Sequence, residues 1–335
     1  MSNKVLFSFG IVLLFVIGFI TNSIEFVATE KDKIISYSPQ EVSNFTGDLY
    51  VSPYGWNSFF FDVLASATES IRIQSYDFTN TNIRDLITDK LDDGINVAIM
   101  LEDRKYRQFR DAYDEIESLW SGYANFSLQS DRELWTNFLH SKYVIVDNRV
   151  ASVQSANITF SAFRNREHFF VTYDTGIIDW LVYLFDKDWL AEVIKEQEIH
   201  PNILLCPIDC RDDILGLIAW AQDSIWIQTQ YISDPEIVQV LQSRIDEVDI
   251  QIVVADTDES QQFIQYFGPA VVRSLKNPYI HTKTMLIDDR VLMIGSINFS
   301  TNSLDNNREL SVIVTDTGAI QNYKHYFLQD WENSL

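Results

Sequence analysis

The sequence predicts a duplicated α/β fold, in which two mixed-sheet α/β repeats are related by pseudo-two-fold symmetry and share one active site at their interface. Two observations predict this fold. First, the motif H-x-K-x-x-x-x-D occurs twice, starting at His140 and again at His281. Second, helical and strand patterns come in the same order before both copies of the motif. Similarity at a fixed spacing is the mark of a repeated structural unit.

Length and composition fit this prediction. The chain of 335 residues has room for two domains, or for one large domain built from two repeats. Apolar residues make up 46% of it, enough for a full hydrophobic core. The formal net charge of −23 is the reverse of the basic balance typical of proteins that bind nucleic acid. Nucleic acid is therefore the less favoured partner.

The N-terminus carries an apolar run over residues 5–20, preceded by Lys4. The run is long for the core of a signal peptide and short for a membrane span, so residues 1–23 are predicted to be a signal peptide or an N-terminal membrane anchor. The positive charge before the run favours export of the catalytic body. The predicted location is thus exported, membrane-anchored or secreted, with polar residues 24–48 as a tether.

Each predicted repeat, 49–199 and 200–335, starts with alternating helices and strands. In the first repeat they are expected at 59–70 (helix), 71–78 (strand), 83–94 (helix) and 95–101 (strand). In the second they are expected at 212–224 (helix), 225–232 (strand), 235–245 (helix) and 249–256 (strand). Gln74 aligns with Gln228 at an offset of 154, whereas the motif histidines are 141 apart. The first repeat therefore has 13 extra residues before its motif.

The extra length falls within residues 102–139. An amphipathic helix is expected at 105–119. The region combines basic and aromatic side chains: Arg104, Lys105, Arg107, Arg110, Trp120 and Trp135. Two interpretations remain open, a solvated helix face or an edge that recruits a phosphate head group.

Each motif predicts a β-hairpin. Residues 142–147 and 283–288 alternate like buried strands, and turns are expected at Asn148-Arg149 and Asp289-Arg290. Return strands follow at 150–155 and 291–296. Since successive side chains of a strand point to opposite faces, the histidine and the lysine of each motif share one face. The return strand then brings a serine and an asparagine beside them.

These groups suit the chemistry of a phosphate. Cations and neutral donors stabilise a tetrahedral oxyanion, and two imidazoles on opposite sides of one phosphorus could serve as attacking group and proton donor in an in-line displacement. The candidate catalytic residues are His140, Lys142, Asp147, His281, Lys283 and Asp288. The candidate phosphate-binding residues are Lys142, Asn157, Lys283, Asn298, Ser155 and Ser296. Glu167 and Glu309 are expected to support the imidazoles. No metal or other cofactor is expected.

The paired motifs resemble those of the phospholipase D superfamily, whose members carry H-x-K-x4-D-x6-G-S-x-N twice. The resemblance extends from about Leu49 to the C-terminus. The second copy fits completely, with Gly295, Ser296 and Asn298. The first copy departs once, because Gln154 stands at the glycine position. A side chain there could narrow the pocket or alter the rate.

The resemblance implies a duplicated phospholipase D-like fold and a covalent phosphohistidine intermediate. His140 would be the nucleophile and His281 the acid and then the base, while Asp147 and Asp288 would mainly support the site. The implied function is metal-independent hydrolysis or transfer of phosphatidyl groups of phospholipids at a membrane surface, by a monomeric catalytic body. The alternatives are an exported endonuclease that cleaves DNA or RNA and, because of Gln154, a non-catalytic module that binds phosphate or lipid.

Cys206 and Cys210 are the two cysteines of the chain. Their spacing is not that of a zinc site. A small-loop disulfide and two free thiols both remain open.

Overall fold

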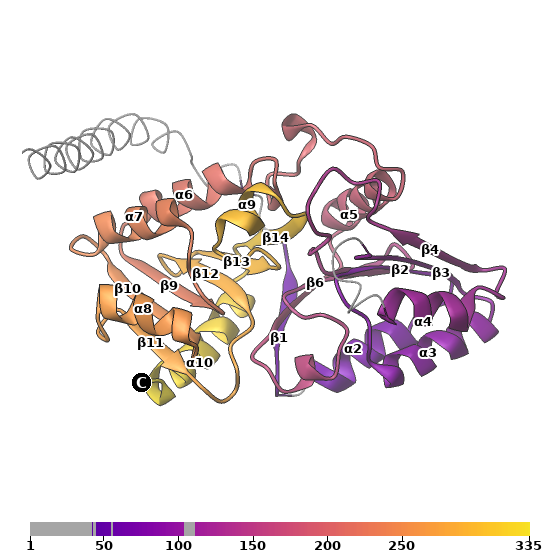
Figure 1. Ribbon diagram of the computed structural model, residues 1–335, viewed down its shortest axis with the longest axis horizontal. Coiled ribbons are helices and arrows are strands. Elements are labelled where there is room, and N and C mark those ends of the chain that lie inside the picture. Colours follow the sequence, from indigo (N-terminus) through magenta and orange to yellow (C-terminus); the bar gives the residue numbers. More distant parts are fainter. Residues whose placement is uncertain (1–41, 43–44, 55, 104–110) are drawn as a thin grey trace, which may run out of the picture.

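The computed structural model describes residues 42, 45–54, 56–103 and 111–335 (Figure 1). The predicted signal or anchor (1–23) and most of the predicted tether (24–48) lie outside the described residues. So do residues 104–110, which include the four basic residues of the predicted recruiting edge. Within the described residues, no helix is both long and apolar enough to cross a membrane.

The first repeat is a seven-stranded mixed sheet with helices. Its elements are β1 (Gly47–Val51), α2 (Trp56–Ala65), β2 (Ser70–Ser75), α3 (Thr81–Asp92), β3 (Asn96–Leu101), α4 (Asp111–Trp120), β4 (Phe126–Ser130), β5 (Tyr143–Val146), β6 (Val150–Gln154), η2 (Ser161–Phe163), β7 (His168–Thr172) and α5 (Thr175–Trp189). The strand order is β1-β7-β6-β5-β2-β3-β4. Only the β2–β3 and β3–β4 pairs are parallel.

The second repeat has the same plan. After η3 (Glu196–Glu198) come β8 (Ile203–Cys206), α6 (Cys210–Trp220), β9 (Ser224–Thr229), α7 (Pro235–Arg244), β10 (Asp249–Ala255), α8 (Asp258–Phe267), β11 (Val272–Leu275), β12 (Lys283–Ile287), β13 (Val291–Gly295), α9 (Thr301–Asp305), β14 (Glu309–Val314) and α10 (Thr317–Asn333). The strand order is β11-β10-β9-β12-β13-β14-β8. Read from β8, this is the order of the first sheet strand for strand, so the predicted duplication is confirmed.

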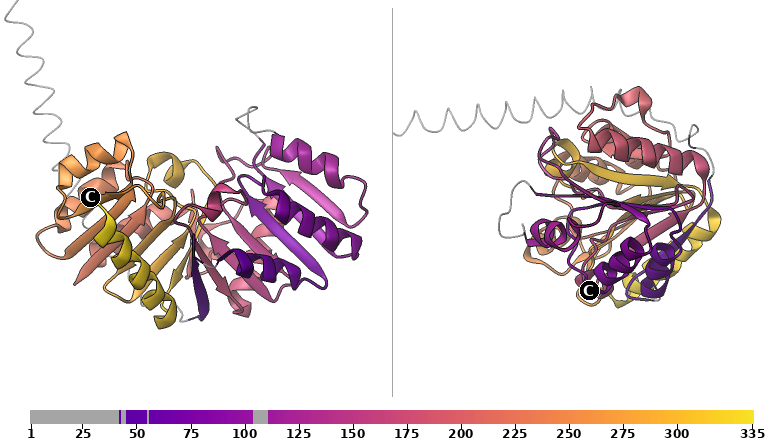
Figure 2. Two further views of the ribbon diagram at one scale, coloured as in Figure 1. Left: turned by 90° about the horizontal axis from the view of Figure 1, so that it is seen from below. Right: turned by 90° about the vertical axis from the view of Figure 1, so that its right-hand side faces the viewer.

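Three apolar clusters hold these layers together. One joins the inner faces of both sheets with α5 and α10, and the other two lie under the outer helices, α2–α4 in one repeat and α6–α9 in the other (Figures 1 and 2). The strands alternate between the clusters: Tyr143 and Ile145 belong to the shared cluster, whereas Val144 and Val146 face the outer helices. This is the period of two expected for strands buried on both faces.

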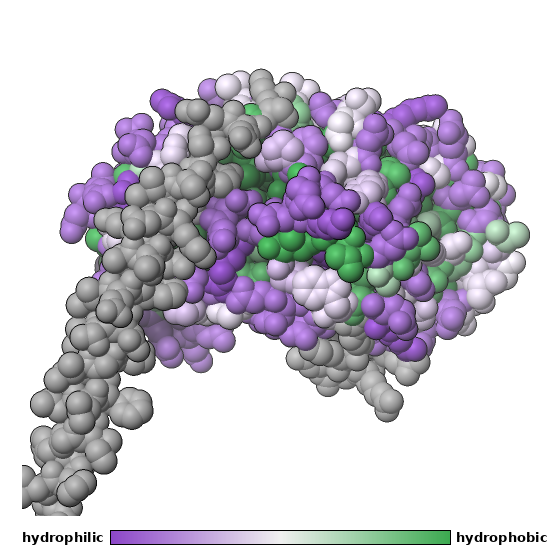
Figure 3. Space-filling view, turned by 90° about the horizontal axis from the view of Figure 1, so that it is seen from above, coloured by the Kyte–Doolittle hydropathy of each residue, from purple (hydrophilic) through white to green (hydrophobic). Residues whose placement is uncertain are grey.

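One face of the molecule is mostly hydrophilic. On the face shown in Figure 3, hydrophilic residues cover most of the molecule, and hydrophobic residues form a narrow band near the middle.

The predicted hairpins form, but their turns lie one residue earlier than expected. Asp147 and Asn148, like Asp288 and Asp289, have φ values between 51° and 56°. Two consecutive left-handed residues are the pattern of a type I′ hairpin turn, which favours Asp and Asn. The aspartate of each motif is therefore the first central residue of its turn.

The same aspartates explain why two helices end before their predicted limits. The carboxylate of Asp147 accepts hydrogen bonds from the backbone N–H groups of Thr68, Glu69 and Ser70, at 2.7–2.8 Å. These groups were expected inside the helix 59–70, but α2 ends at Ala65. Asp288 binds the N–H groups of residues 222–224 in the same way, and α6 ends at Trp220.

A disulfide joins Cys206 to Cys210, with their Cα atoms 5.1 Å apart. The structure thus selects one of the two alternatives that the sequence left open for these cysteines. The bond links the end of β8 to the first residue of α6.

Two buried ion pairs cross the boundary between the repeats. Arg166 of the first repeat binds Asp330 of α10 through two N–O contacts of 2.6 and 2.7 Å. Arg308 of the second repeat lies 3.0 Å from Asp188 of α5. All four side chains are at most 3% exposed. Buried charges of this kind are costly unless they are paired.

We therefore expect the substitution Arg308→Met to lower the free energy of unfolding by about 3–5 kcal/mol, because it leaves Asp188 as an uncompensated buried charge. The matched control is Arg149→Met. Arg149 pairs with Glu69 at the surface, where the two side chains are 69% and 63% exposed. This change is expected to cost less than about 1 kcal/mol. Urea unfolding of both variants measures the difference, and equal losses would contradict a dominant role for the buried pair.

Candidate active site

His140 and His281 lie just before the two motif strands, β5 and β12, and each is hydrogen-bonded to the opposite repeat. The Nδ1 atom of His140 lies 2.7 and 2.8 Å from the carboxylate oxygens of Glu309 in β14. The Nδ1 atom of His281 lies 2.6 Å from the carboxylate of Glu167. Each imidazole is thus oriented by a glutamate of the other repeat, which leaves the Nε2 atoms for the substrate.

Backbone hydrogen bonds also join each histidine segment to the opposite repeat. The N–H groups of His140 and Ser141 both donate to the carbonyl of Arg308, at 2.9 and 2.8 Å. Those of His281 and Thr282 donate to the carbonyl of Arg166, at 3.1 and 2.9 Å. The consecutive residues Arg166-Glu167 and Arg308-Glu309 therefore each hold the histidine segment of the opposite repeat, through the arginine carbonyl and the glutamate carboxylate.

The motif serines are bonded to these glutamates. Ser155 Oγ donates to Glu167 at 2.5 Å, and Ser296 Oγ donates to Glu309 at 2.6 Å. Both serines are fully buried. Their hydroxyls, expected to bind phosphate, are engaged in holding the carboxylates.

The environment of Glu309 is richer in donors than that of Glu167. Besides His140 and Ser296, it accepts hydrogen bonds from Ser303 Oγ at 2.6 Å and from Asn307 Nδ2 at 3.2 Å. Burial alone would raise the pKa of Glu309, but the adjacent imidazole and the other partners lower it below its usual value. The carboxylate that orients His140 is therefore charged.

Burial also controls the cations of the site. It lowers the pKa of Lys142 to about 7 and that of Lys283 to about 8, against the opposing effect of the two glutamates. Each ammonium donates to the carbonyl of its own motif histidine. Both lysines are fully buried.

The imidazoles are mostly neutral at pH 7. Burial lowers the pKa of His140 to about 4, with a further decrease from Lys142 and an opposing increase from Glu309. The pKa of His281 is lowered by burial as well, although Glu167 opposes the shift. With its Nδ1–H donated to the carboxylate, a neutral imidazole presents a free lone pair at Nε2.

The side-chain oxygens of the two motif asparagines are available to a ligand. The buried Oδ1 atoms of Asn157 and Asn298 have no hydrogen-bond partner among the described residues. Buried polar atoms without partners are uncommon in proteins. Both asparagines follow the motif serines by two residues, so their amides are candidates to meet a bound phosphate.

Asp147 and Asp288 are bonded away from the histidines. Their carboxylates accept hydrogen bonds from backbone amides at and just before the start of β2 and β9. Backbone hydrogen bonds lower the pKa of Asp147 and outweigh the effect of its partial burial. Both aspartates thus stabilise the start of a strand, β2 or β9, and their hydrogen bonds do not involve the imidazoles.

Tyr76 is a neighbour of the site that sequence reasoning missed. Its ring lies edge-on to the His140 ring at 5.3 Å and 5.7 Å from the ammonium of Lys142. At the offset of 154 its counterpart is Gln230, so comparison of the repeats gives no signal for it. Its place directly after β2, where a strand ends at the site, is the signal that could have found it.

The first repeat accommodates Gln154 at the position where the second repeat requires glycine, Gly295. A Cβ atom at Gly295 would lie 2.2 Å from the carbonyl oxygen of Leu310, so a side chain is excluded there. Gln154 is 1% exposed, and its amide donates to the carbonyl of Ala156 at 3.0 Å. The extra side chain is accommodated beside the end of β6.

His168 lies in the interface between the repeats. Its Nδ1 atom is 2.7 Å from the hydroxyls of Thr282 and Thr284, and it is fully buried. Burial lowers its pKa to about 3. Its contacts are those of a structural histidine.

The arrangement can stabilise a phosphate between two imidazoles and two lysines. The ammonium and amide groups can neutralise the equatorial oxygens of a phosphate, and each repeat supplies one imidazole whose Nδ1 atom is held by a glutamate. Across the described parts of the chain, no group of three or more His, Cys, Asp or Glu side chains has the geometry of a metal site.

Known proteins resemble this chain in sequence. Cardiolipin synthase 1 of Bacillus anthracis is 23% identical over 327 residues, which covers 81% of this chain and 63% of that protein. Cardiolipin synthase 2 of Staphylococcus epidermidis is 23% identical over 314 residues, covering 80% of this chain and 64% of that protein. The chain thus spans somewhat less than two thirds of the length of these curated relatives.

Solved structures share the fold. A phosphatidylserine synthase from Haemophilus influenzae matches with a TM-score of 0.69 at 12% identity, covering 92% of this chain and 91% of that chain. A polyphosphate kinase from Porphyromonas gingivalis matches with a TM-score of 0.65 at 15% identity, covering 84% of this chain and 50% of that chain. At these identities the likeness establishes the duplicated α/β fold alone.

A family profile described as "Cardiolipin synthase, PLD-like domain" matches residues 60–189 and 214–331, one segment in each repeat. The two segments cover more than half of the chain and contain both motifs. The chain therefore belongs to the phospholipase D superfamily, as a member of this cardiolipin synthase-like family.

Proposed function

We propose that the protein is a phospholipase D-type phosphodiesterase that hydrolyses or transfers phosphatidyl groups of membrane phospholipids through a phosphohistidine intermediate. The observation that carries the proposal is the crossed arrangement of the two His–Glu pairs, at 2.6–2.8 Å. It supplies one imidazole from each repeat, each held at its Nδ1 atom by a glutamate, which supports a site with two histidines. Similarity to cardiolipin synthases supports a phospholipid as the substrate.

In the first step the neutral imidazole of His140 attacks phosphorus through the Nε2 lone pair. The bond between phosphorus and the head-group oxygen breaks, and its electron pair stays with that oxygen. His281, protonated at Nε2, gives its proton to the departing oxygen, while Glu167 stabilises the imidazolium before the transfer. The phosphatidyl group is now bonded to His140, whose Nδ1–H is held by Glu309.

In the second step neutral His281 removes the proton of a water or an alcohol, whose oxygen attacks phosphorus. The P–N bond to His140 breaks, and its electron pair returns to Nε2. Water gives phosphatidate and an alcohol gives a new phosphodiester. Lys142, Lys283, Asn157 and Asn298 stabilise the equatorial oxygens in both steps. In place of phosphate binding, we assign Ser155 and Ser296 to holding the glutamates.

The first test uses the full-length protein with phosphatidylglycerol vesicles in EDTA. We expect phosphatidate or a transfer product, and a loss of more than about 10³-fold in the His140→Ala variant, because the covalent route is removed. His325→Ala, a change of an exposed histidine outside the motifs, is the matched control and should retain activity. Parallel assays use single- and double-stranded DNA. Cleavage of DNA without any reaction on the vesicles would contradict the proposal and support the nuclease.

The assignment of roles predicts which variant can be trapped. With a p-nitrophenyl phosphodiester, whose leaving group needs no proton, His281→Asn should accumulate label bonded to His140, since the base for its release is missing. His140→Asn should show no label. Acid quench and peptide mapping locate the label, and a covalent adduct on His281 in the His140→Asn variant would reverse the roles.

The lowered pKa values predict an acidic optimum for kcat/KM. His140 must be neutral to attack, which its pKa of about 4 allows at all but low pH. His281 must be protonated, which its lowered pKa restricts to pH values below about 6.5. Loss of charge from Lys142 and Lys283 near pH 7 and 8 acts in the same direction. A pH profile of kcat/KM on vesicles checks this, and a rate that keeps rising up to about pH 9 would contradict it.

A further inference from the structure

The disulfide between Cys206 and Cys210 lies beside Glu309, the glutamate that binds His140. In the ladder between β8 and β14, Cys206 is the residue directly opposite Glu309. Both cysteines are fully buried. One end of the disulfide is therefore on the strand next to the carboxylate that orients the proposed nucleophile.

The first repeat has a serine at the equivalent position. Ser52 aligns with Cys206 at the offset of 154; it comes directly after β1, and Cys206 is the last residue of β8. The N–H group of Ser52 donates to the carbonyl of Glu167, and the N–H group of Glu167 donates to Ser52 Oγ, both at 3.0 Å. The hydroxyl itself donates to the carbonyl of Asn165 at 2.5 Å. In this repeat a buried serine thus holds the glutamate segment by hydrogen bonds.

The second repeat cannot form the same side-chain hydrogen bonds at this position. A disulfide sulfur has no hydrogen to donate and is a weak acceptor. The arginine contact differs as well. Arg166 donates from Nη1 to the carbonyl of Ser52 at 2.6 Å, whereas Nη1 of Arg308 has no hydrogen-bond partner within the described ranges of the chain. The restraint on the residue opposite Glu309 is therefore a covalent bond, where the first repeat uses hydrogen bonds.

The other end of the disulfide reaches α9, which binds the side chain of Glu309. Sγ of Cys210 lies 3.6 Å from the carbonyl oxygen of Leu304, and both residues belong to one apolar cluster. The preceding residue, Ser303, donates its hydroxyl to Glu309 at 2.6 Å. The disulfide thus lies between the strand that pairs with Glu309 and the helix that binds its carboxylate.

Arg211, the second residue of α6, joins the same end of this helix to α9. Its guanidinium binds the carboxylate of Asp305 through two contacts of 2.7 Å and that of Asp234 through contacts of 2.9 and 3.1 Å. Thr301 of α9 donates to Asp234 as well, at 2.7 Å. The start of α6, which contains Cys210, is therefore fixed relative to α9.

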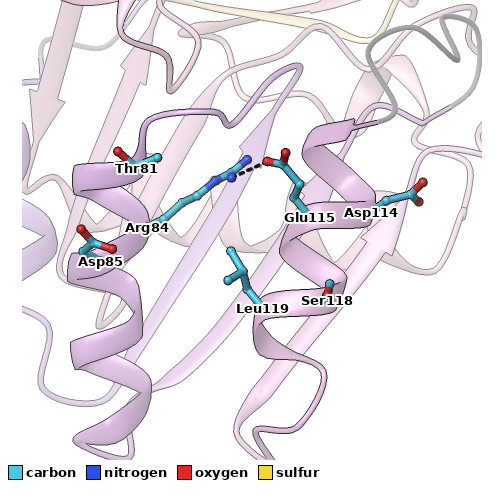
Figure 4. Close-up of a pocket in the computed structure, with 7 residues that line it drawn as sticks. All are labelled: Thr81, Arg84, Asp85, Asp114, Glu115, Ser118 and Leu119. Atoms are coloured by element: carbon cyan, nitrogen blue, oxygen red, sulfur yellow. Dashed lines mark hydrogen bonds and ion pairs between the residues drawn. The ribbon is translucent and has the colours of Figure 1, made fainter.

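The first repeat joins its outer helices in another place. At the offset of 154, a tryptophan and an asparagine stand at the positions of Cys210 and Arg211. Instead, Arg84 of α3 binds Glu115 of α4 at 2.6 Å, beside a cavity of about 690 Å³ (Figure 4). None of the residues that line this cavity belongs to the first motif. A restraint on an outer helix next to the glutamate is therefore particular to the second repeat.

We infer that the disulfide between Cys206 and Cys210 positions Glu309 and, through it, the imidazole of His140. The inference rests on the proposed function, in which His140 is the nucleophile. The bond fixes the end of β8 to the start of α6, and with it the place of the Glu309 carboxylate between Ser303 and Nδ1 of His140. A small displacement of a reacting group is enough to slow an attack along one line.

The test measures the attack of His140 alone. In the His281→Asn background with a p-nitrophenyl phosphodiester, the burst of p-nitrophenol reports formation of the bond between phosphorus and His140. Replacing both cysteines by alanine should slow this burst about tenfold at saturating substrate, because Glu309 no longer holds the imidazole in line. The substrate concentration that gives half of the maximal burst rate should stay unchanged, since the phosphate-binding groups are intact.

A rescue variant separates positioning from stability. Cys206→Ser with Cys210→Ala also lacks the disulfide, but it supplies the hydroxyl that Ser52 provides in the first repeat. Its burst rate should therefore return to within about threefold of the parent. The matched control is Ile214→Val, which weakens the packing of a buried residue of α6 and should keep the parent rate. Thermal unfolding followed by circular dichroism verifies that each variant is folded at the assay temperature.

The outcomes are distinct. A parent burst rate in the double alanine variant would overturn the inference. Equal losses in the alanine and serine variants would also overturn it, because they would reflect stability alone. So would two free thiols in the denatured wild-type protein, counted by mass spectrometry after alkylation. A wild-type protein without any reaction on the p-nitrophenyl substrate or on phospholipid vesicles would instead remove the proposed function.

Discussion

The site depends on two Arg-Glu dipeptides, Arg166-Glu167 and Arg308-Glu309, whose residues bind the opposite repeat. In each pair the arginine forms a buried ion pair with a helix of the opposite repeat, and its carbonyl holds the opposite histidine segment. The next residue, Glu167 or Glu309, orients that histidine. One repeat alone would therefore have a histidine without its carboxylate. The contacts that hold the repeats together and those that set the imidazole tautomers are adjacent in the chain, so docking of the repeats and assembly of the site occur together.

The sequence predicted most of this arrangement, for physical reasons that also explain its failures. Strand periodicity and the spacing of the motifs predicted the sheets, the hairpins and the motif residues that gather at the boundary. They could not predict which glutamate meets which histidine, because that pairing depends on how the repeats dock. The helix limits at Ala65 and Trp220 were missed because a distant aspartate takes the amides that would have continued the helix. The state of Cys206 and Cys210 was left open because spacing alone does not fix Cα separation.

Duplication gave two similar halves, and some of the differences between them lie around the site. Glu309 has two additional donors in Ser303 and Asn307, and Tyr76 lies against His140 where the second repeat has Gln230. These additional contacts restrain His140, which suits a nucleophile that must attack along one line.

The charges of the site explain how a buried histidine with a lowered pKa can act as an acid. Near pH 7 the free site holds two glutamate anions against two lysines, whose pKa values of about 7 and 8 leave them partly charged, and two largely neutral imidazoles. A phosphodiester brings one further negative charge between them. An added anion favours the charged form of every nearby base, so it raises the pKa of Lys142, Lys283 and both imidazoles together, that of His140 from a starting value of about 4. Substrate binding therefore supplies the electrostatic condition for protonating His281, and the same proton is then given to the head-group oxygen as the negative charge moves onto it.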